Sequence, residues 1–539
     1  MASTLNSLTF DETFMIAAGV RGVATGNISM GWDQPPVMFY VYGAAAQIYG
    51  AEATSSGLWR PSEDSTVMLP PEVARTLPPR IDASKPVPRW GLYTRYDYAR
   101  QFFADPRNDP EAIALAARSA AVLVALTLGI MVALFTWRRE GELAAVLSVF
   151  ALMFAPDILA HSSIAWNDLP FATAFFLGLW VWDAALRDPK ASRMLTAGAA
   201  TGLALGVKFS ALALGPAAIV LALLEAARRR FDRAWLRQVA MLVPASLVVA
   251  WIVLAILYRG DVSLVEFREG VANQLQHAAQ GHGVPAFLLG HVGEAGLWYF
   301  YPVAMVLKTP IAMLALIPLA VIGFAVTWRN TGWKQVVVES PLRMLPVGIG
   351  VYGLLLVRSA LAIGVRYALP LLPLFAILIG IGLSRIWQHY GRRMRVTIGA
   401  LAVAHAALAL AYYPWFLTYL SEFVPQRRER GYLTMVDSNI DWGQGLLAVR
   451  DFMREENVQS IYLSYFGLVL PESYGIRYSP LPSWMPLPQG QPLPAQPQWV
   501  VISATHLQGF YTTDDPFSQF RNRLPDRILA NSLYAFRIQ

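Results

Sequence analysis

Polar residues with complementary chemistry flank several of the long apolar stretches in this chain. They are Asp11, Glu12, Asp33, Gln34, Asp168, Lys208, Lys308, Arg366 and Tyr367. Ionisable side chains at a membrane boundary are costly to bury, and for this reason they often mark a functional site. Cations can hold a phosphate group, and a carboxylate can take a proton from a hydroxyl group. Together these residues predict a site that binds a phosphate and activates a nucleophile.

Each of these residues also has a structural interpretation. Asp11 and Glu12 precede a helical stretch over 13–25 and could cap it, as Asp168 could cap a helix from Leu169. Lys208 and Lys308 could extend to the membrane interface, and Arg366 could anchor a helix end. The functional prediction depends on their combination.

The composition shows which elements must position these residues. The 539 residues are 55% hydrophobic and only 15% charged, whereas soluble domains carry roughly a quarter charged residues. From Glu111 onward we count about ten apolar stretches of spanning or near-spanning length. They cover 113–137, 143–159, 169–186, 195–207, 210–224, 239–257, 297–328, 345–357, 368–386 and 396–417. The fourth and fifth are short and meet at Lys208, which predicts a broken or re-entrant pair.

Basic residues gather at alternate connections between these stretches. The clusters lie around Arg138, Arg187, Arg228, Arg329 and Arg385. The positive-inside bias places these connections in the cytoplasm. Residues 1–108, 157–168, 259–294, 358–366 and the chain after 421 then lie on the opposite face. The net charge of +7 does not indicate a nucleic-acid partner, because membrane-spanning stretches separate the clusters.

Ten crossings place both chain ends outside, although no signal peptide is recognisable at Met1. We expect an upstream helix that this sequence lacks. The alternative is that 36–50 inserts as a short span; Gln47 and the Pro-Pro start favour an interfacial helix there.

The tail after Ser421 has a different pattern. It predicts strands at 432–436, 460–465, 499–503 and 528–538, a helix at 445–455 and a Pro-rich segment at 480–497. The predicted fold is therefore an α-helical polytopic membrane protein of about ten or eleven spans with a small C-terminal α/β domain. The predicted regions are an outer first loop (1–110), a transmembrane domain (111–420) and the C-terminal domain (421–539).

Several short motifs, in their order and spacing, resemble the C-type glycosyltransferases, which use polyprenyl-phosphate sugars. The nearest resemblance is to the bacterial protein O-mannosyltransferase-like family (glycosyltransferase family 39) and the lipid A aminoarabinose transferases. The motifs are LTFDETF (8–14), Pro35-Pro36, Lys208-Phe209-Ser210, WYFYP to KTP (298–310), GVRYALP (364–370) and VDSNIDWGQ (436–444). The family's first helix, before the first outer loop, has no counterpart here. Gln34 stands where relatives commonly have His, so an acid–base role at this position is in doubt.

The resemblance implies that Asp11 is the catalytic base, with Glu12 beside it. Arg366, helped by Lys208 or Lys308, would hold the donor phosphate, and Asp33, Gln34, Asp168 and Tyr367 would bind substrate. The reaction would be an inverting single displacement on the periplasmic face of a bacterial inner membrane. The acceptor would be a protein, a lipid or a glycan. Asp437, Asn439, Asp441 and Trp442 could bind acceptor or cap the site, or could form a structural turn.

Other interpretations remain open. A transporter or flippase for a lipid-linked or small anionic substrate would also carry polar residues in its spans. A non-enzymatic assembly protein would use the same charges structurally. No cofactor is required, because the phosphate leaving group is already charged, although Asp11, Glu12 and Asp168 could supply oxygen ligands to a divalent metal. The absence of cysteine excludes thiolate metal sites, and His161, His277, His282 and His291 are too scattered for a metal motif.

Overall fold

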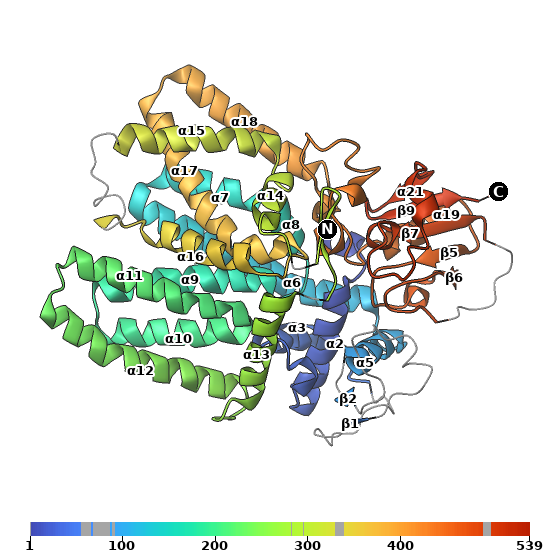
Figure 1. The fold of residues 1–539 in the computed structure, drawn as a ribbon, viewed down its shortest axis with the longest axis horizontal. Coiled ribbons are helices and arrows are strands. Elements are labelled where there is room, and N and C mark those ends of the chain that lie inside the picture. Colours follow the sequence, from blue (N-terminus) through green and yellow to red (C-terminus); the bar gives the residue numbers. More distant parts are fainter. Residues whose placement is uncertain are drawn as a thin grey trace. The chain divides into compact units, whose positions relative to one another are not determined.

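The fold combines long apolar helices with a small C-terminal sheet, as seen in a computed structural model (Figure 1). The structure describes residues 2–54, 66–67, 87–88, 92–281, 283–294, 296–328, 339–488 and 497–538. Arg329, His282 and residues 489–496 of the Pro-rich segment lie outside these residues. The chain forms two compact units that alternate along the sequence. The first unit contains 1–32, 38–120 and 440–539, and the second contains 33–37 and 121–439.

Within the described residues, six helical segments are long and apolar enough to cross a membrane. They are α6 (Pro110–Glu140), α9 (Asp168–Arg187), η2 with α11 (Phe209–Arg228), α12 (Arg233–Leu257), η4 with α17 (Val365–His389) and α18 (Arg392–Leu410). Shorter apolar helices are α3 (Val37–Ile48), α7 (Glu142–Met153) and α16 (Met344–Arg358). The chain is a multi-pass membrane protein with a mostly helical fold, as the apolar pattern predicts.

One predicted span, 297–328, is broken. It forms α14 (Phe300–Leu307) and α15 (Ile311–Trp328), bent by 112° between them. Pro310 explains the break, because proline cannot donate a backbone hydrogen bond and disfavours helical geometry in the residue before it. The last predicted span is also shorter than expected, since α18 ends at Leu410.

The remaining elements of the second unit connect these helices. They are α8 (Pro156–His161), α10 (Ala191–Val207), α13 (Val265–Gln280), β3 (Ala286–Leu288), β4 (His291–Gly293), η5 (Phe416–Thr418), η6 (Gly431–Leu433) and η7 (Asp437–Asn439). Helix α10 packs between α9 and α12, and α17 packs against α7 and α15. Gly382 on α17 allows one close contact, because a Cβ there would lie 2.3 Å from the carbonyl oxygen of Ala320. Small residues at such crossings are typical of membrane helices.

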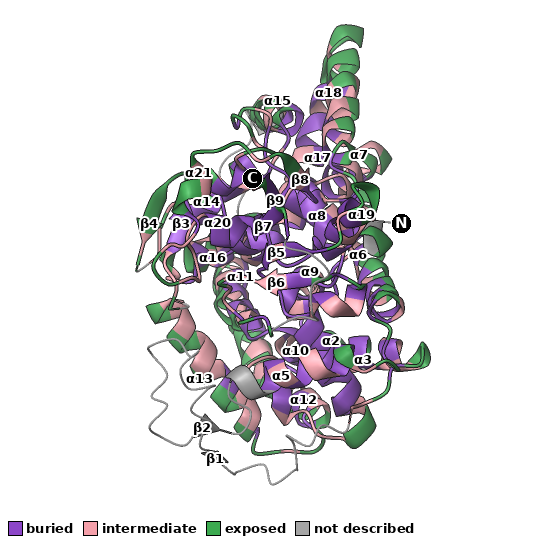
Figure 2. Ribbon diagram, turned by 90° about the vertical axis from the view of Figure 1, so that its right-hand side faces the viewer, coloured by how far each residue is buried: buried purple, intermediate pink, exposed green. Residues whose placement is uncertain are grey.

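Helices α12 and α18 leave much of their surface exposed (Figure 2). On α12 the exposed side chains include Met241, Leu247, Trp251 and Ile256, which are large and apolar. Such residues on a long apolar helix are suited to contact with lipid tails.

The first unit joins both ends of the chain. Its N-terminal part contains α1 (Ala2–Leu5), α2 (Phe10–Thr25), η1 (Ser29–Gly31), most of α3, β1 (Thr66–Val67), β2 (Val87–Pro88), α5 (Leu92–Ala104) and the start of α6. Helices α2 and α3 cross closely at Gly19 and Gly43, where a Cβ on Gly43 would lie 2.2 Å from the Gly19 carbonyl carbon.

The C-terminal part of this unit is a five-stranded sheet of order β6-β5-β7-β9-β8. The strands are β5 (Ile461–Ser464), β6 (Tyr478–Pro480), β7 (Trp499–Ser503), β8 (Arg527–Leu529) and β9 (Leu533–Arg537), and the helical elements are α19 (Leu446–Glu455), η8 (Pro471–Tyr474), α20 (Ala504–Leu507) and α21 (Ser518–Arg521). Strand β7 runs parallel to β5 and antiparallel to β9. Its apolar, β-branched run explains its place at the centre, because a strand covered on both faces needs no polar alternation.

The small α/β domain is confirmed, but three details of the tail prediction are wrong. The predicted strand at 432–436 is instead the 3-10 turn η6. The predicted final strand at 528–538 is a hairpin of β8 and β9. Strand β6 was missed; it is three residues long, ends in proline and lies at the sheet edge, where a strand with proline is tolerated.

Candidate functional site

Asp168 is the first residue of α9, and its carboxylate faces two basic side chains. The side chain is 1% exposed. The ammonium group of Lys208 donates a hydrogen bond to Oδ1, and Nη1 of Arg366 lies 3.6 Å from Oδ2. Asn167, which precedes the helix, makes no capping hydrogen bond. Asp168 therefore belongs to a buried charge cluster in the second unit.

Lys208 lies where α10 ends and a 3-10 turn begins. Its backbone is extended, with φ −156° and ψ 137°, so the chain breaks here between two helical segments. The predicted break at Lys208 is present. The side chain is 7% exposed, which rules out extension to the membrane interface. Its ammonium nitrogen lies 4.5 Å from the ring centroid of Tyr367, a cation–π contact.

Arg366 and Tyr367 belong to the 3-10 turn η4 that begins the α17 span. The guanidinium carbon of Arg366 lies 5.2 Å from the centroid of the Tyr367 ring, so this ring contacts both cations. The backbone carbonyl of Tyr367 accepts a 2.9 Å hydrogen bond from the hydroxyl of Tyr352. Gly364, just before the turn, has no room for a side chain, because a Cβ would lie 2.4 Å from Ser438 Oγ.

Lys308 lies at the break between α14 and α15 and is completely buried. Its ammonium group donates hydrogen bonds of 2.6 and 2.7 Å to the backbone carbonyls of Leu417 and Asn439. The carboxylate of Asp157 lies 3.7 Å away. These bonds fix Lys308 in place and contradict its interpretation as an interfacial side chain.

His161 lies near both carboxylates of this region. Its Nδ1 is 2.8 Å from the carbonyl oxygen of Asp157. Burial lowers the pKa of His161, and Asp168 and Asp157 oppose that effect. A histidine with a lowered pKa is neutral at pH 7, so His161 adds no charge to the cluster.

Five charged side chains gather in this region. We define the donor-site cluster as Asp157, Asp168, Lys208, Lys308 and Arg366, all in the second unit. They are two acidic and three basic side chains, none of them more than 8% exposed. Basic side chains that lie together in a buried site are suited to bind an anion such as a phosphate.

Gln34 is brought to this cluster, because its side-chain carbonyl accepts a 2.8 Å hydrogen bond from Asn167, the neighbour of Asp168. Asp33 is half-buried beside it in the chain, at the start of the Pro35-Pro36 step. The predicted substrate-binding residues Gln34, Asp168, Lys208, Arg366 and Tyr367 therefore gather in one place.

Asp11 and Glu12 lie in the first turn of α2 in the first unit. Thr9 caps this helix in a capping box, in which Glu12 accepts a hydrogen bond from the Thr9 backbone N–H. Arg118 of α6 binds both carboxylate oxygens of Glu12 at 2.8 Å, and neither side chain is more than 1% exposed. Asp11 is half-buried. The two adjacent acids thus have different surroundings, and the capping interpretation of Glu12 is confirmed.

The N-terminal turn is also fixed from the far end of the sequence. Ser7 N–H donates to the Gln444 carbonyl at 3.0 Å, and Phe10 N–H donates to the Trp442 carbonyl at 2.7 Å. The Ser7 hydroxyl donates to the Gly443 carbonyl and accepts from Leu446 N–H, both at 2.9 Å. The segment that holds the Asp11 turn in the first unit therefore runs from Trp442 to Leu446.

The described residues contain no group of three or more His, Asp or Glu side chains that could hold a metal ion. Of the three acids considered as metal ligands, Glu12 is bound by Arg118 and Asp168 by Lys208. Their carboxylates are thus already neutralised by cations.

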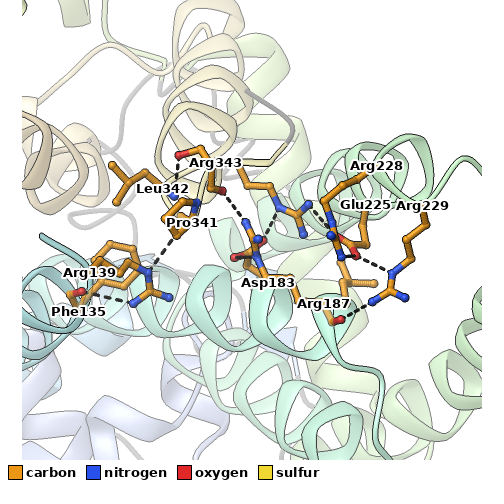
Figure 3. Close-up of polar contacts among 12 residues, drawn as sticks. Phe135, Arg139, Asp183, Arg187, Glu225, Arg228, Arg229, Pro341, Leu342 and Arg343 are labelled. Atoms are coloured by element: carbon orange, nitrogen blue, oxygen red, sulfur yellow. Dashed lines mark hydrogen bonds and ion pairs between the residues drawn. The ribbon is translucent and has the colours of Figure 1, made fainter. Parts of the chain in front are cut away.

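Sequence reasoning missed Arg118, Asp157, His161 and a second buried network. That network contains Asp183 and Arg187 at the end of α9, Glu225, Arg228 and Arg229 at the end of α11, and Arg343 before α16 (Figure 3). We call it the arginine network. A carboxylate inside an apolar stretch was the available signal, because an acid in a span needs a partner.

Three comparisons with known proteins follow. Residues 112–255 match a family model described as dolichyl-phosphate-mannose-protein mannosyltransferase. No curated protein matches the sequence. Two crystal structures of ArnT from Cupriavidus metallidurans are similar at 14% identity. For the apo structure the TM-score is 0.44. The match covers 80% of this chain and 64% of that chain, which is just under two thirds of its length. The structure bound to undecaprenyl phosphate has a TM-score of 0.46, with coverage of 99% and 94%. The family match confirms the resemblance to mannosyltransferases over residues 112–255.

Proposed function

We propose that this chain is a membrane glycosyltransferase that moves a sugar from a polyprenyl-phosphate donor to an acceptor. The observation that carries the proposal is the donor-site cluster, in which the buried side chains of Lys208 and Arg366 both contact the Tyr367 ring. A phosphate diester carries a negative charge that such basic side chains can bind. The family match over 112–255 supports the class of reaction.

The donor phosphate contacts Lys208 and Arg366, which flank the Tyr367 ring. In the reaction, an acceptor hydroxyl oxygen attacks the anomeric carbon while the bond from this carbon to the phosphate oxygen breaks. The electron pair of that bond stays on the phosphate, which leaves as polyprenyl phosphate with a second negative charge. The fixed cations stabilise this developing charge, and the single displacement inverts the anomeric centre.

Asp11 takes the proton of the acceptor hydroxyl. We assign this role to Asp11, the position that the family resemblance indicates. The Glu12 carboxylate is bound by Arg118 and by the Thr9 backbone. Glu12 instead fixes the turn that carries Asp11. The reaction takes place on the periplasmic face of a bacterial inner membrane, and the acceptor is a protein, a lipid or a glycan. Asp33 and Gln34 position the sugar, and Asp168 orients Lys208 and Arg366, with which its carboxylate is paired.

The test is release of polyprenyl phosphate by purified protein from a panel of polyprenyl-phosphate sugars. Asp11→Asn is compared with Glu52→Gln, an exposed acid in the same unit, as the matched control. We expect release from at least one donor in the wild type and in the control, with a loss of about 100-fold or more in Asp11→Asn. Full turnover in Asp11→Asn would contradict the base assignment. No release from any donor by folded protein would favour transport of a lipid-linked substrate.

A further inference from the structure

Asn439 stands at the end of η7, within the VDSNIDWGQ motif, and is 1% exposed. Its side-chain carbonyl accepts a 2.9 Å hydrogen bond from the backbone N–H of Val365. Its side-chain amide donates to the carbonyls of Ile363 and Val436 at 3.0 and 2.8 Å. The side chain therefore binds the backbone on both sides of Gly364, immediately before Arg366.

The backbone of the same residue binds a second cation. The carbonyl oxygen of Asn439 accepts the 2.7 Å hydrogen bond from Lys308. One residue thus holds the turn that carries Arg366 and the ammonium group of Lys308. Asp lacks the amide donor, and Ala lacks both the donor and the acceptor. Neither side chain would therefore satisfy these three backbone groups.

We infer that Asn439 is the positioning residue of the donor-phosphate site, which sets the location of Arg366 and Lys308 relative to each other. This inference rests on the proposed function of that cluster. Asn439 touches no reacting atom; it acts through the two cations. A displacement of about 1 Å in a positioning contact can cost about 100-fold in rate, so a small shift of this turn is expected to matter.

The first unit offers a matched control in Asn108, also 1% exposed. Asn108 uses the same pattern, in which Oδ1 accepts from Glu52 N–H at 2.9 Å and Nδ2 donates to the Glu52 and Phe102 carbonyls at 2.9 and 3.0 Å. Loss of either side chain removes three hydrogen bonds to backbone. The two alanine variants are therefore expected to lose similar stability, and only one of them should change the phosphate site.

The experiment measures binding of undecaprenyl phosphate to the full chain in lipid nanodiscs, with thermal stability in parallel. We expect Asn439→Ala to weaken binding by about tenfold or more. Asn439→Asp should weaken it further, because the added carboxylate would repel the negatively charged phosphate. In turnover assays the KM for the donor should rise in both variants while the KM for the acceptor is unchanged. Asn108→Ala should bind as the wild type does.

Hydrogen–deuterium exchange supplies a readout that needs no ligand. Exchange of the Val365 amide should accelerate in Asn439→Ala and stay unchanged in Asn108→Ala. Unchanged exchange, or wild-type affinity for undecaprenyl phosphate in both Asn439 variants, would overturn the positioning role. Absence of binding by the wild type would instead contradict the proposed function, and the exchange result would still decide whether Asn439 holds the turn.

Discussion

The two ends of α9 carry buried charge clusters that are built in opposite ways. At the start, Asp168 pairs with Lys208 and lies 3.6 Å from Arg366, a separation longer than a hydrogen bond. At the end, Asp183 accepts hydrogen bonds of 2.6 Å from Arg343 and 2.9 Å from Arg187. The carboxylate of one cluster is satisfied on every side, whereas the other leaves a cation at the distance of a loose pair.

The two clusters also differ in their access to water. In the arginine network, Arg187, Arg228 and Arg229 are 26–34% exposed, so solvent screens their charges. In the donor-site cluster the basic side chains are at most 7% exposed. The geometry around the carboxylate and the access of solvent, more than the presence of buried charge, distinguish the two clusters.

The largest expected effect comes from a substitution in the arginine network, at the C-terminal end of α9. Arg343→Met removes a fully buried partner of both Asp183 and Glu225. Loss of one partner of a buried ion pair typically costs about 3–5 kcal/mol, because it leaves a buried charge uncompensated. We expect a large drop in thermal stability, while the turnover of the remaining folded protein stays near that of the wild type. Arg138→Met, at an exposed arginine, is the control and should change neither quantity.

A substitution in the donor-site cluster, at the start of α9, should instead reduce activity more than thermal stability. Arg366→Gln is expected to reduce polyprenyl phosphate release about 100–1,000-fold, because it removes a fixed donor to the leaving group. Its effect on thermal stability should be smaller than that of Arg343→Met. Arg187→Gln removes an arginine from the other end of α9 and should retain activity. Equal losses of activity in the two glutamine variants would remove the distinction between the clusters.

A smaller expected effect compares how much a bound ligand raises the melting temperature of variants in the two clusters. Asp168→Asn leaves Lys208 and Arg366 without their carboxylate, so undecaprenyl phosphate should bind the variant more tightly than the wild type. A tenfold gain in affinity adds about 1.4 kcal/mol of stabilisation at saturating ligand. The ligand should therefore raise the melting temperature of Asp168→Asn more than that of the wild type. Asp183→Asn should show no extra rescue, and an equal rescue of both would show that the ligand does not recognise the donor-site cluster.

A further effect concerns acid stability away from both clusters. His506 in the C-terminal sheet lies 2.9 Å from Ser464 Oγ through Nδ1 and accepts the Trp484 backbone N–H at Nε2. Burial lowers the pKa of His506 to about 3 from its usual 6.5. The folded state keeps His506 neutral while the unfolded state takes up a proton below pH 6.5, so stability falls as the pH drops from 6.5 toward 3.

Between pH 7 and pH 5 this protonation should cost about 2 kcal/mol, at 1.36 kcal/mol per pH unit below 6.5. His506→Gln retains an acceptor for Trp484 N–H and should flatten the pH dependence of unfolding. An unchanged slope in this variant would assign the acid sensitivity to other groups. The result separates loss of activity by domain unfolding from titration within the donor-site cluster.

The sequence predicts the membrane helices well, because apolar runs are long and their ends carry basic residues. It also predicts the break at Lys208 and the grouping of Gln34, Asp168, Lys208, Arg366 and Tyr367 among the candidate residues. It does not predict how Glu12 is bound, because its partner Arg118 lies 106 positions away along the chain. Roles that depend on a partner more than 100 positions away have no local signal.

The same limit explains the misassigned strand at 432–436. Its residues favour a strand by composition, but the chain there turns to present Asn439 to Val365. Tertiary hydrogen bonds override such local preferences. The catalytic role of Asp11 and the binding roles of all the candidate substrate-binding residues remain predictions, which the Asp11, Arg366 and Asp168 variants begin to test.

The backbone bonds from Ser7 and Phe10 to Trp442 and Gln444 have a consequence for synthesis of the protein. The two segments are separated by more than 430 residues, as the Ser7–Gly443 bond illustrates with a separation of 436. At a translation rate of about 5–20 residues per second, the partners of the Asp11 turn emerge roughly 20 to 90 s after the turn itself. Throughout this interval the helices of the second unit can insert while the Asp11 turn lacks these partners. The Asp11 turn therefore gains these backbone partners only when translation of the chain is nearly finished.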